Sequence, residues 1–229
     1  IYAMTLYVYG EKYLPNENLT DGVWCVGDLA TELGFKNGDV FVSADGEKID
    51  RFSDVLEKII LSEKIVVERN GINTSVEMPV NVVDRLLKNE RQLLFYPRIP
   101  CIVNAVFENS AAEKAGMLKK DVLVSINNKS IKYHDEVKSE LQKYKNTDVS
   151  IMVARGGRDV ELIASVNDEG GVGFATEMPS LKELEVLGYY SFASNEYSFF
   201  ASLPAGYNKA IKKLGSYIDQ FMLILSPSS

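Results

Sequence analysis

Two stretches of the chain carry the same order of apolar and polar positions. Residues 30–49 return as residues 112–131, at an offset of 82. The identical residues are Ala30, Gly34, Asp39, Val40, Val42, Ser43 and Ile49 in the first stretch, and Ala112, Gly116, Asp121, Val122, Val124, Ser125 and Ile131 in the second. Self-similarity at a fixed period indicates one supersecondary unit that is built more than once. The chain is therefore predicted to hold two copies of one module.

Within each copy the pattern predicts short helices between β-strands. The first helix ends at Gly34 or Gly116, because glycine readily adopts the left-handed conformation that closes a helix. A β-rich run follows, then a second helix with apolar residues four apart, then two strands joined by a tight turn. The apolar positions of the second helix are Val55 and Ile59 in the first copy and Val137 and Leu141 in the second. This order predicts an α+β or mostly β class, with two small, partly open β-barrels in tandem.

From about Met178 the chain becomes rich in aromatic residues. Pro204 suits the first turn of a helix, and apolar residues then recur three and four apart. These spacings predict a long C-terminal amphipathic helix. Its apolar face could lie in a membrane interface, or it could pack on the modules or on a second copy. The candidate membrane-facing residues are Tyr207, Ile211, Leu214, Ile218 and Phe221.

Composition and charge exclude several classes of protein. The chain is 46% hydrophobic and 25% charged, which is typical of a globular protein. Its net charge is −7, so it is a poor partner for a phosphate backbone, and nucleic acid is excluded. No apolar run approaches the roughly 18 residues of a membrane-spanning helix.

The sequence offers few residues for catalysis. His134 is the single histidine, whereas a zinc-binding protease helix needs two histidines and a serine triad needs one beside the nucleophile. Cys25 and Cys101 lie at different positions of the repeat, so they are either two buried thiols or one bridge. We therefore expect no catalytic residue, no metal site and no cofactor in this chain.

The duplicated pattern resembles the PDZ module of bacterial envelope proteases. The most specific stretch is residues 109–117, N-S-A-A-E-K-A-G-M, which is close to that family's N-S-A-A-x-x-A-G-(L/M). Two such modules in tandem, followed by an aromatic amphipathic segment, resemble the extracytoplasmic part of RseP-type site-2 proteases. The resemblance implies an N-terminal β arm next to a membrane span over residues 1–19, then PDZ domains over 20–88 and 89–178. Residues 179–229 would form an aromatic-rich linker and a juxtamembrane helix.

The resemblance also implies a function. Site-2 proteases of this kind are intramembrane zinc metalloproteases that cut membrane-protein substrates, such as anti-sigma factors, after another protease has trimmed them. Their H-E-x-x-H motif lies in a membrane span outside the PDZ tandem, and this sequence lacks it. The chain would then be a regulatory region that faces the periplasm at the inner membrane and gates access of trimmed substrates. Zinc would belong to the parent enzyme, and the membrane surface would be a second partner.

PDZ domains bind an extended peptide along a sheet edge, beside a helix. The resemblance places the edge strand of the second module at Leu93, Leu94, Phe95 and Tyr96, with leucine at Leu94 where relatives carry glycine. That substitution counts against capture of a C-terminal carboxylate. Val137 and Leu141 would wall this groove, and Val55 and Ile59 that of the first module. His134 would read a ligand hydroxyl or lie on the surface without a role. The alternative is that both grooves are closed and these side chains are core.

Two other functions remain open at this point. The chain could be the paired PDZ tail of an HtrA-type serine protease, although such tails rarely carry a long aromatic helix. It could also be a peptide-binding scaffold with no protease attached.

Overall fold

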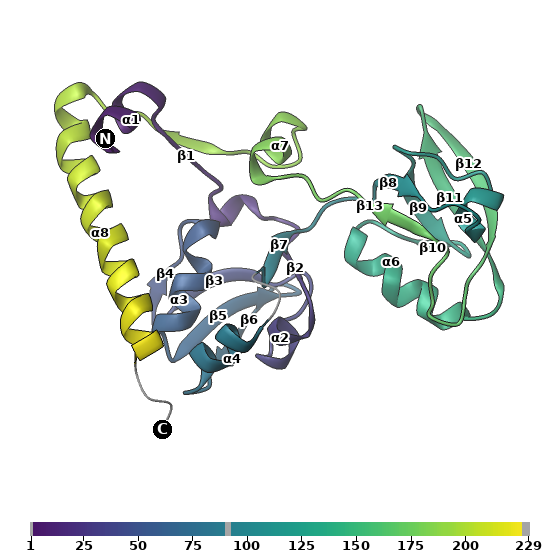
Figure 1. The fold of residues 1–229 in the computed structure, drawn as a ribbon, viewed down its shortest axis with the longest axis horizontal. Coiled ribbons are helices and arrows are strands. Elements are labelled where there is room, and N and C mark those ends of the chain that lie inside the picture. Colours follow the sequence, from purple (N-terminus) through teal and green to yellow (C-terminus); the bar gives the residue numbers. More distant parts are fainter. Residues whose placement is uncertain (1, 90–92, 226–229) are drawn as a thin grey trace.

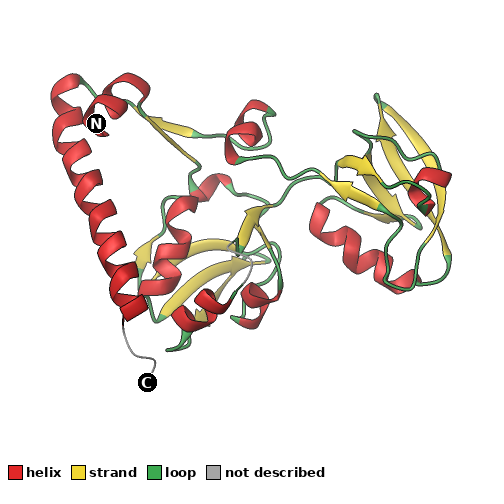
Figure 2. Ribbon diagram, in the orientation of Figure 1, coloured by secondary structure: helices red, strands yellow, loops and turns green. Residues whose placement is uncertain are grey.

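The computed structural model describes residues 2–89 and 93–225. Two modules lie side by side along the longest axis of the molecule, and the N- and C-terminal segments meet at one end (Figure 1). Figure 2 shows strands at the centre of each module with helices around them. The predicted fold class is confirmed: the modules are mostly β, with several helices and open sheets.

Both modules share one topology. The first has a four-stranded sheet of order β4-β3-β5-β6, and the second has a matching sheet of order β10-β9-β11-β12. The strands of the first sheet are β3 (Val40–Ala44), β4 (Glu47–Lys48), β5 (Lys64–Arg69) and β6 (Ile72–Glu77). Those of the second are β9 (Val122–Ile126), β10 (Lys129–Ser130), β11 (Asp148–Arg155) and β12 (Arg158–Ser165).

A two-stranded antiparallel ribbon completes each module. In the first module β2 (Val23–Cys25) pairs with β7 (Phe95–Pro97), and in the second β8 (Val103–Val106) pairs with β13 (Phe174–Thr176). The helices of the first module are α2 (Asp28–Glu32), α3 (Val55–Leu61) and α4 (Val82–Lys88). Those of the second are α5 (Ala111–Lys114) and α6 (His134–Leu141). Each module therefore closes with a strand from its far end that pairs with its opening strand.

The repeated sequence positions explain why the two modules fold alike. Along β11, Val149, Ile151 and Val153 alternate with more exposed residues and are almost fully buried, as expected for a strand with one face on a core. Asp39 and Asp121 are also buried, and each accepts two hydrogen bonds from an arginine of the following long strand, Arg69 or Arg155. The aspartate that occurs in both copies of the repeat thus forms an ion pair that holds one loop against the sheet.

The division between the modules lies later than the sequence predicts. Leu94, Phe95 and Tyr96 belong to the core of the first module, together with Ile99, whereas Cys101 belongs to the core of the second. The stretch that we assigned to the second module's edge strand is therefore the closing strand of the first. The assignment was wrong because β7 pairs with β2, which is far away in the sequence, and no local pattern indicates that pairing.

The terminal segments form a layer of their own beside the first module. The N-terminal arm, predicted to be β, is the helix α1 (Tyr2–Tyr9) followed by the short strand β1 (Glu11–Tyr13), which pairs with β14 (Ala193–Asn195). Gly10, at φ +64°, ends the helix and turns the chain into the strand. Since residues 1–9 are almost continuously apolar, periodicity could not distinguish a helix from a strand there.

The last helix, α8 (Phe199–Leu225), packs along α1 (Figure 1). It begins at Phe199 rather than at Pro204, which lies inside it. A Cβ added at Gly206 would come within 2.4 Å of the Ala3 nitrogen, so glycine permits this close approach. Upstream, Leu184 on α7 (Leu181–Val186) and Tyr190 after it lie in the first module's core, so part of the predicted linker is packed. No helix within residues 2–89 and 93–225 combines the length and apolarity needed to cross a bilayer.

Candidate functional site

The second module contains a groove between β13 and α6. Within the described residues β13 pairs only with β8, so its other edge is free of strand partners. Side chains and backbone of β13, α6 and the preceding loop surround a cavity of about 790 Å³. Val137 and Leu141 line its helical wall, and both also belong to the module core. An open strand edge beside a helix is the geometry that accepts an added peptide strand.

A glycine-rich loop forms one end of this groove. Gly170, Gly171 and Gly173 line the cavity just before β13. Within the described part of the chain, the amides of Val172 and Gly173 donate to no backbone or side-chain acceptor. Gly173 has φ +94°, and a Cβ there would come within 2.3 Å of the Ser110 Cβ, so only glycine fits. Free amides in such a loop form a site for a carboxylate.

His134 lies at the other end of the groove, at the first position of α6. Its Nε2 is 2.7 Å from Oγ1 of Thr176 on β13, so this contact crosses the groove. Its Nδ1 is buried and has no partner among the described atoms. Burial lowers the pKa of His134, although the neighbouring Asp135 carboxylate opposes that effect. His134 is therefore a half-buried, neutral side chain that faces the groove, rather than a surface residue.

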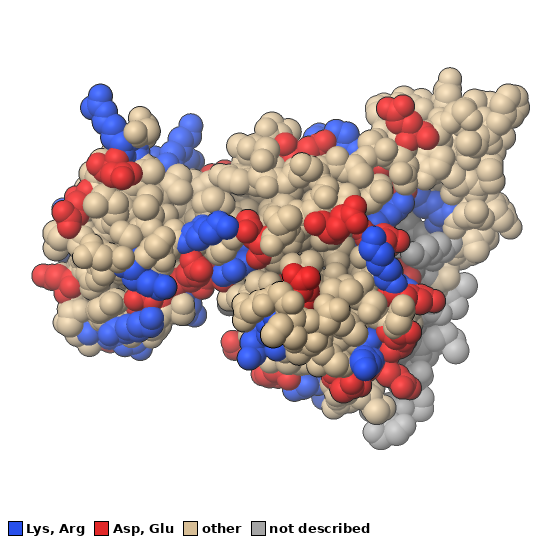
Figure 3. Space-filling view, turned by 180° about the vertical axis from the view of Figure 1, so that it is seen from behind, with Lys and Arg blue, Asp and Glu red and all other residues tan. Residues whose placement is uncertain are grey.

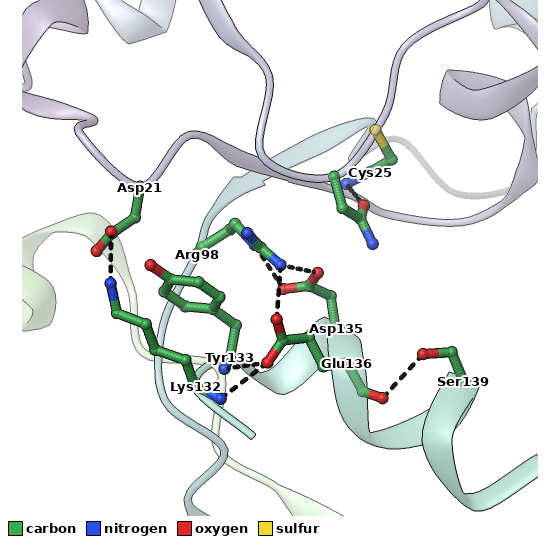
Figure 4. Close-up of polar contacts among 9 residues, drawn as sticks. Asp21, Cys25, Arg98, Lys132, Tyr133, Asp135, Glu136 and Ser139 are labelled. Carbon is green, nitrogen blue, oxygen red and sulfur yellow. Dashed lines mark hydrogen bonds and ion pairs between the residues drawn. The ribbon is translucent and has the colours of Figure 1, made fainter. Parts of the chain in front are cut away.

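Contacts with the first module hold the start of α6. The Arg98 guanidinium, from the segment between the modules, makes two hydrogen bonds of 2.8 and 3.0 Å to the Asp135 carboxylate, whose side chain is 2% exposed. It also lies 3.9 Å from the centre of the Tyr133 ring (Figure 4). Lys132 forms an ion pair of 2.9 Å with Asp21 of the first module (Figure 4). The helix that walls the groove is thus fixed to the neighbouring module.

Trp24 of the first module reaches the groove directly. Its ring lies 4.6 Å from the His134 ring and 6.5 Å from the Tyr96 ring, edge-on to both. It lines the groove cavity together with residues of the second module. Trp24 is the single tryptophan of the chain, and tryptophan is a residue type that is enriched at contact hot spots. Nothing in a linear pattern places it against a helix more than 100 residues away.

The first module has a much smaller hollow at the equivalent place. Leu93, Leu94 and Phe95 face Val55 on α3 across a cavity of about 130 Å³. Ile59 is fully buried in the core, and the Tyr96 hydroxyl donates to the Pro179 carbonyl. Of the residues predicted for peptide binding, the structure thus places Val137, Leu141 and His134 at the large groove. It places Leu93, Leu94, Phe95 and Val55 at the small one, with Ile59 and Tyr96 outside both.

The loop of residues 170–173 escaped the sequence analysis. The repeat itself carries the signal that would have found it, because Phe95 of the first module and Phe174 of the second both follow the paired strands of a hairpin and begin the closing strand. If the ends of the two modules are aligned, Leu94 of the first module corresponds to Gly173 of the second. The second module therefore has glycine at the position where relatives carry it. The argument against carboxylate capture therefore applies to the first module only.

The residues present do not fit a zinc site. Within the described residues no three histidine, cysteine or carboxylate side chains are grouped so that they could hold a metal ion. Cys25 and Cys101 are free thiols in different cores, and burial raises the pKa of each to about 12. A thiol that stays protonated and buried is a poor metal ligand.

On the C-terminal helix, the predicted membrane-facing residues Tyr207, Ile211 and Leu214 are exposed, at 51–67% of their surface. The side chains of Ile218 and Phe221 lie outside those that the structure describes. Tyr9 and Phe200 are more exposed still, and Tyr7 packs edge-on against Phe199. Figure 3 shows an area without charged groups at the upper corner of this end of the molecule, bordered by charged side chains.

Comparison with known proteins agrees with this geometry. Residues 71–166 match the PDZ domain family, so the chain carries a PDZ domain. It is 28% identical over 130 residues to a Vibrio cholerae protein named "Putative zinc metalloprotease", covering 55% of this chain and 27% of that protein. It is 30% identical over 98 residues to zinc metalloprotease RasP of Shouchella clausii, and this match covers 39% of this chain and 22% of that protein. The chain spans about a quarter of the length of these relatives.

Solved structures that match part of the chain include the PDZ domain of an SdrC-like protein from Listeria innocua. That match has a TM-score of 0.31 and 23% identity, and covers 35% of this chain and 97% of the other. A second is an HtrA-type protease, AlgW, with a decapeptide, at a TM-score of 0.26 and 15% identity, covering 52% of this chain and 43% of the other.

Proposed function

We propose that this chain is the tandem PDZ regulatory region of an intramembrane zinc metalloprotease, and that the groove of its second module binds the C-terminal end of a substrate peptide. The observation that carries this proposal is the free edge of β13 opposite α6, closed at one end by the unpaired amides of the 170–173 loop. A peptide added as a strand would form hydrogen bonds with the free backbone groups of β13. Its terminal carboxylate would accept hydrogen bonds from the unpaired amides of the loop.

The lining of the groove supports an apolar side chain on the last residue of the peptide. The helical wall presents Val137 and Leu141, and the neutral His134 offers one ring nitrogen beside Thr176. A hydrophobic terminal side chain would therefore pack near Leu141, and the backbone would run toward His134. The smaller hollow of the first module offers too little volume for the same mode of binding.

Titration of the chain with a hydrophobic tetrapeptide, followed by NMR, tests this proposal. We expect shifts in the amides of Val172, Gly173 and β13, and at least about tenfold weaker binding of the same peptide with an amidated C-terminus. The amidated peptide is the matched control, because it differs only in the charge that the loop would hold. Equal binding of the two forms would rule out carboxylate capture, and no shift with either would rule out the site.

In the parent enzyme, the two modules would face the periplasm above the membrane-embedded active site and exclude substrates with a bulky, untrimmed ectodomain. The relatives support this role because their names describe zinc metalloproteases, and this chain matches only about a quarter of their length. Deletion of both modules from the full-length enzyme should speed the cleavage of untrimmed substrate. Unchanged cleavage would show that the modules do not gate.

A further inference from the structure

The groove of the second module does not end at that module. It joins a cleft of about 720 Å³ between the modules, and Trp24 and Lys138 line both hollows. The cleft continues over α2 and the end of α4, where Asp28, Arg85 and Lys88 line it. A ligand that leaves the groove beside Trp24 therefore enters a second, connected hollow that belongs mainly to the first module.

The direction of a bound peptide follows from where its carboxylate is held. The 170–173 loop precedes β13, and Thr176 ends it, opposite His134. A strand advances about 3.3 Å per residue, so the three residues of β13 accommodate only about three or four peptide residues. Residues further upstream must pass His134 and meet Trp24.

We infer that Trp24 of the first module is a ligand-contacting residue of the second module's site, and that the inter-module cleft selects acidic side chains upstream of the peptide's C-terminal residues. This inference rests on the proposed function. Trp24 is half-buried, held edge-on between His134 and Tyr96, so its remaining face forms a fixed wall. A rigid, partly exposed tryptophan at the centre of a contact commonly contributes much of the binding energy.

The charges of the cleft give the preference for acidic residues. Arg85 is already paired with Glu32, at 3.0 Å. Within the described residues Lys88 and Lys138 make no ion pair, and Asp28 is the opposing carboxylate without one. Lys138 stands where the groove meets the cleft, so it would lie beside the first peptide residues that pass Trp24. Charge complementarity at such a position contributes mainly to specificity.

The experiment uses three peptides that share the same four C-terminal residues. One is the tetrapeptide, and the others are decapeptides with either glutamate or lysine upstream. Trp24 is the single tryptophan of the chain, so its emission reports this position without any substitution. We expect the decapeptides to shift that emission more than the tetrapeptide does. We also expect the glutamate peptide to bind about tenfold more tightly than the tetrapeptide, a gain typical of one contact hot spot.

Variants separate the residues involved. Trp24→Ala should remove the advantage of the glutamate decapeptide over the tetrapeptide. Lys138→Gln should remove the preference for glutamate over lysine. The control is Lys132→Ala, which breaks the ion pair to Asp21 outside the groove and should leave all three affinities unchanged. If the tetrapeptide fails to bind, the proposed function fails. If it binds as tightly as both decapeptides and Trp24 emission does not respond, the inference alone fails.

Discussion

A single carboxylate in each module holds together a loop that the sequence repeat marks. Asp121 is 1% exposed, and it accepts two hydrogen bonds of 2.7 Å from Arg155 and one of 2.8 Å from the Leu118 amide. Asp39 makes the same set of contacts with Arg69 and the Lys36 amide. The identity of this position in both copies thus follows from a structural need, because a carboxylate can accept from three donors at once and a neutral amide or hydroxyl cannot match its charge to the arginine.

Asp121→Ala should lower the free energy of unfolding by about 2 to 3 kcal/mol, since it leaves Arg155 and the Leu118 amide without their acceptor. Urea unfolding followed by circular dichroism measures this change. Lys58→Ala is the control, because its pair with Glu47 is on the surface and should contribute no measurable stability. A loss for Asp121→Ala no larger than that of the control would show that the buried pair is not stabilising.

His134 should make stability depend on pH. Its folded-state pKa is lowered by burial, so the unfolded chain binds a proton more readily than the folded one. The stabilisation from this residue is therefore complete above the ordinary histidine pKa of about 6.5, and it is lost as the pH falls from there toward the folded-state pKa. Between pH 7.5 and 5.5, the urea midpoint of the wild type should fall more than that of His134→Gln. Parallel curves for the two proteins would contradict this assignment.

At the scale of elements, the groove depends on the backbone of the loop before β13. Gly173→Ala should destabilise the chain by more than about 1 kcal/mol and abolish peptide binding, because φ +94° and the nearby Ser110 leave no room for a Cβ. Gly171→Ala is a matched control in the same loop. A Cβ there would be 3.6 Å from its nearest neighbour, an ordinary contact, so its stability should stay within about 0.5 kcal/mol of the wild type. Equal thermal shifts for the two variants would argue against a strained loop.

The elements also show how far the sequence predicts this fold. Residues 30–49 and 112–131 repeat, so the central strands and helices of both modules followed from local pattern. The closing strands β7 and β13 did not, because each is three residues long and pairs with a strand more than 60 residues away. For that reason the sequence predicts one wall of the groove, the helix α6 with Val137 and Leu141. It does not predict the opposite wall, which is the free edge of β13.

At the scale of the whole molecule, Arg98 should fix the two modules relative to each other. Arg98→Ala leaves the buried Asp135 carboxylate without its partner, so the start of α6 should separate from the first module. We expect a larger radius of gyration in solution scattering and a red-shifted Trp24 emission. Lys132→Ala, which removes an exposed pair between the same modules, should change neither. An unchanged scattering profile for Arg98→Ala would show that packing alone holds the modules.

The exposed apolar side chains of α1 and of the first half of α8 should bind lipid. With a net charge of −7, the chain gains little from anionic headgroups, so binding must come from apolar burial, and neutral vesicles should serve at least as well as anionic ones. In flotation with phosphatidylcholine vesicles, Phe200→Ser combined with Tyr207→Ser should reduce binding at least about tenfold, because each lost aromatic removes more than 1 kcal/mol of transfer energy. Ile163→Ser is the control, since Ile163 is 59% exposed but lies on β12 of the second module. Flotation should fall for the α8 variant alone if the exposed face of α8 is embedded in lipid, because Ile163 lies on the other module. Equal flotation of the α8 variant and the Ile163→Ser control would assign the exposed face of α8 to a protein contact instead.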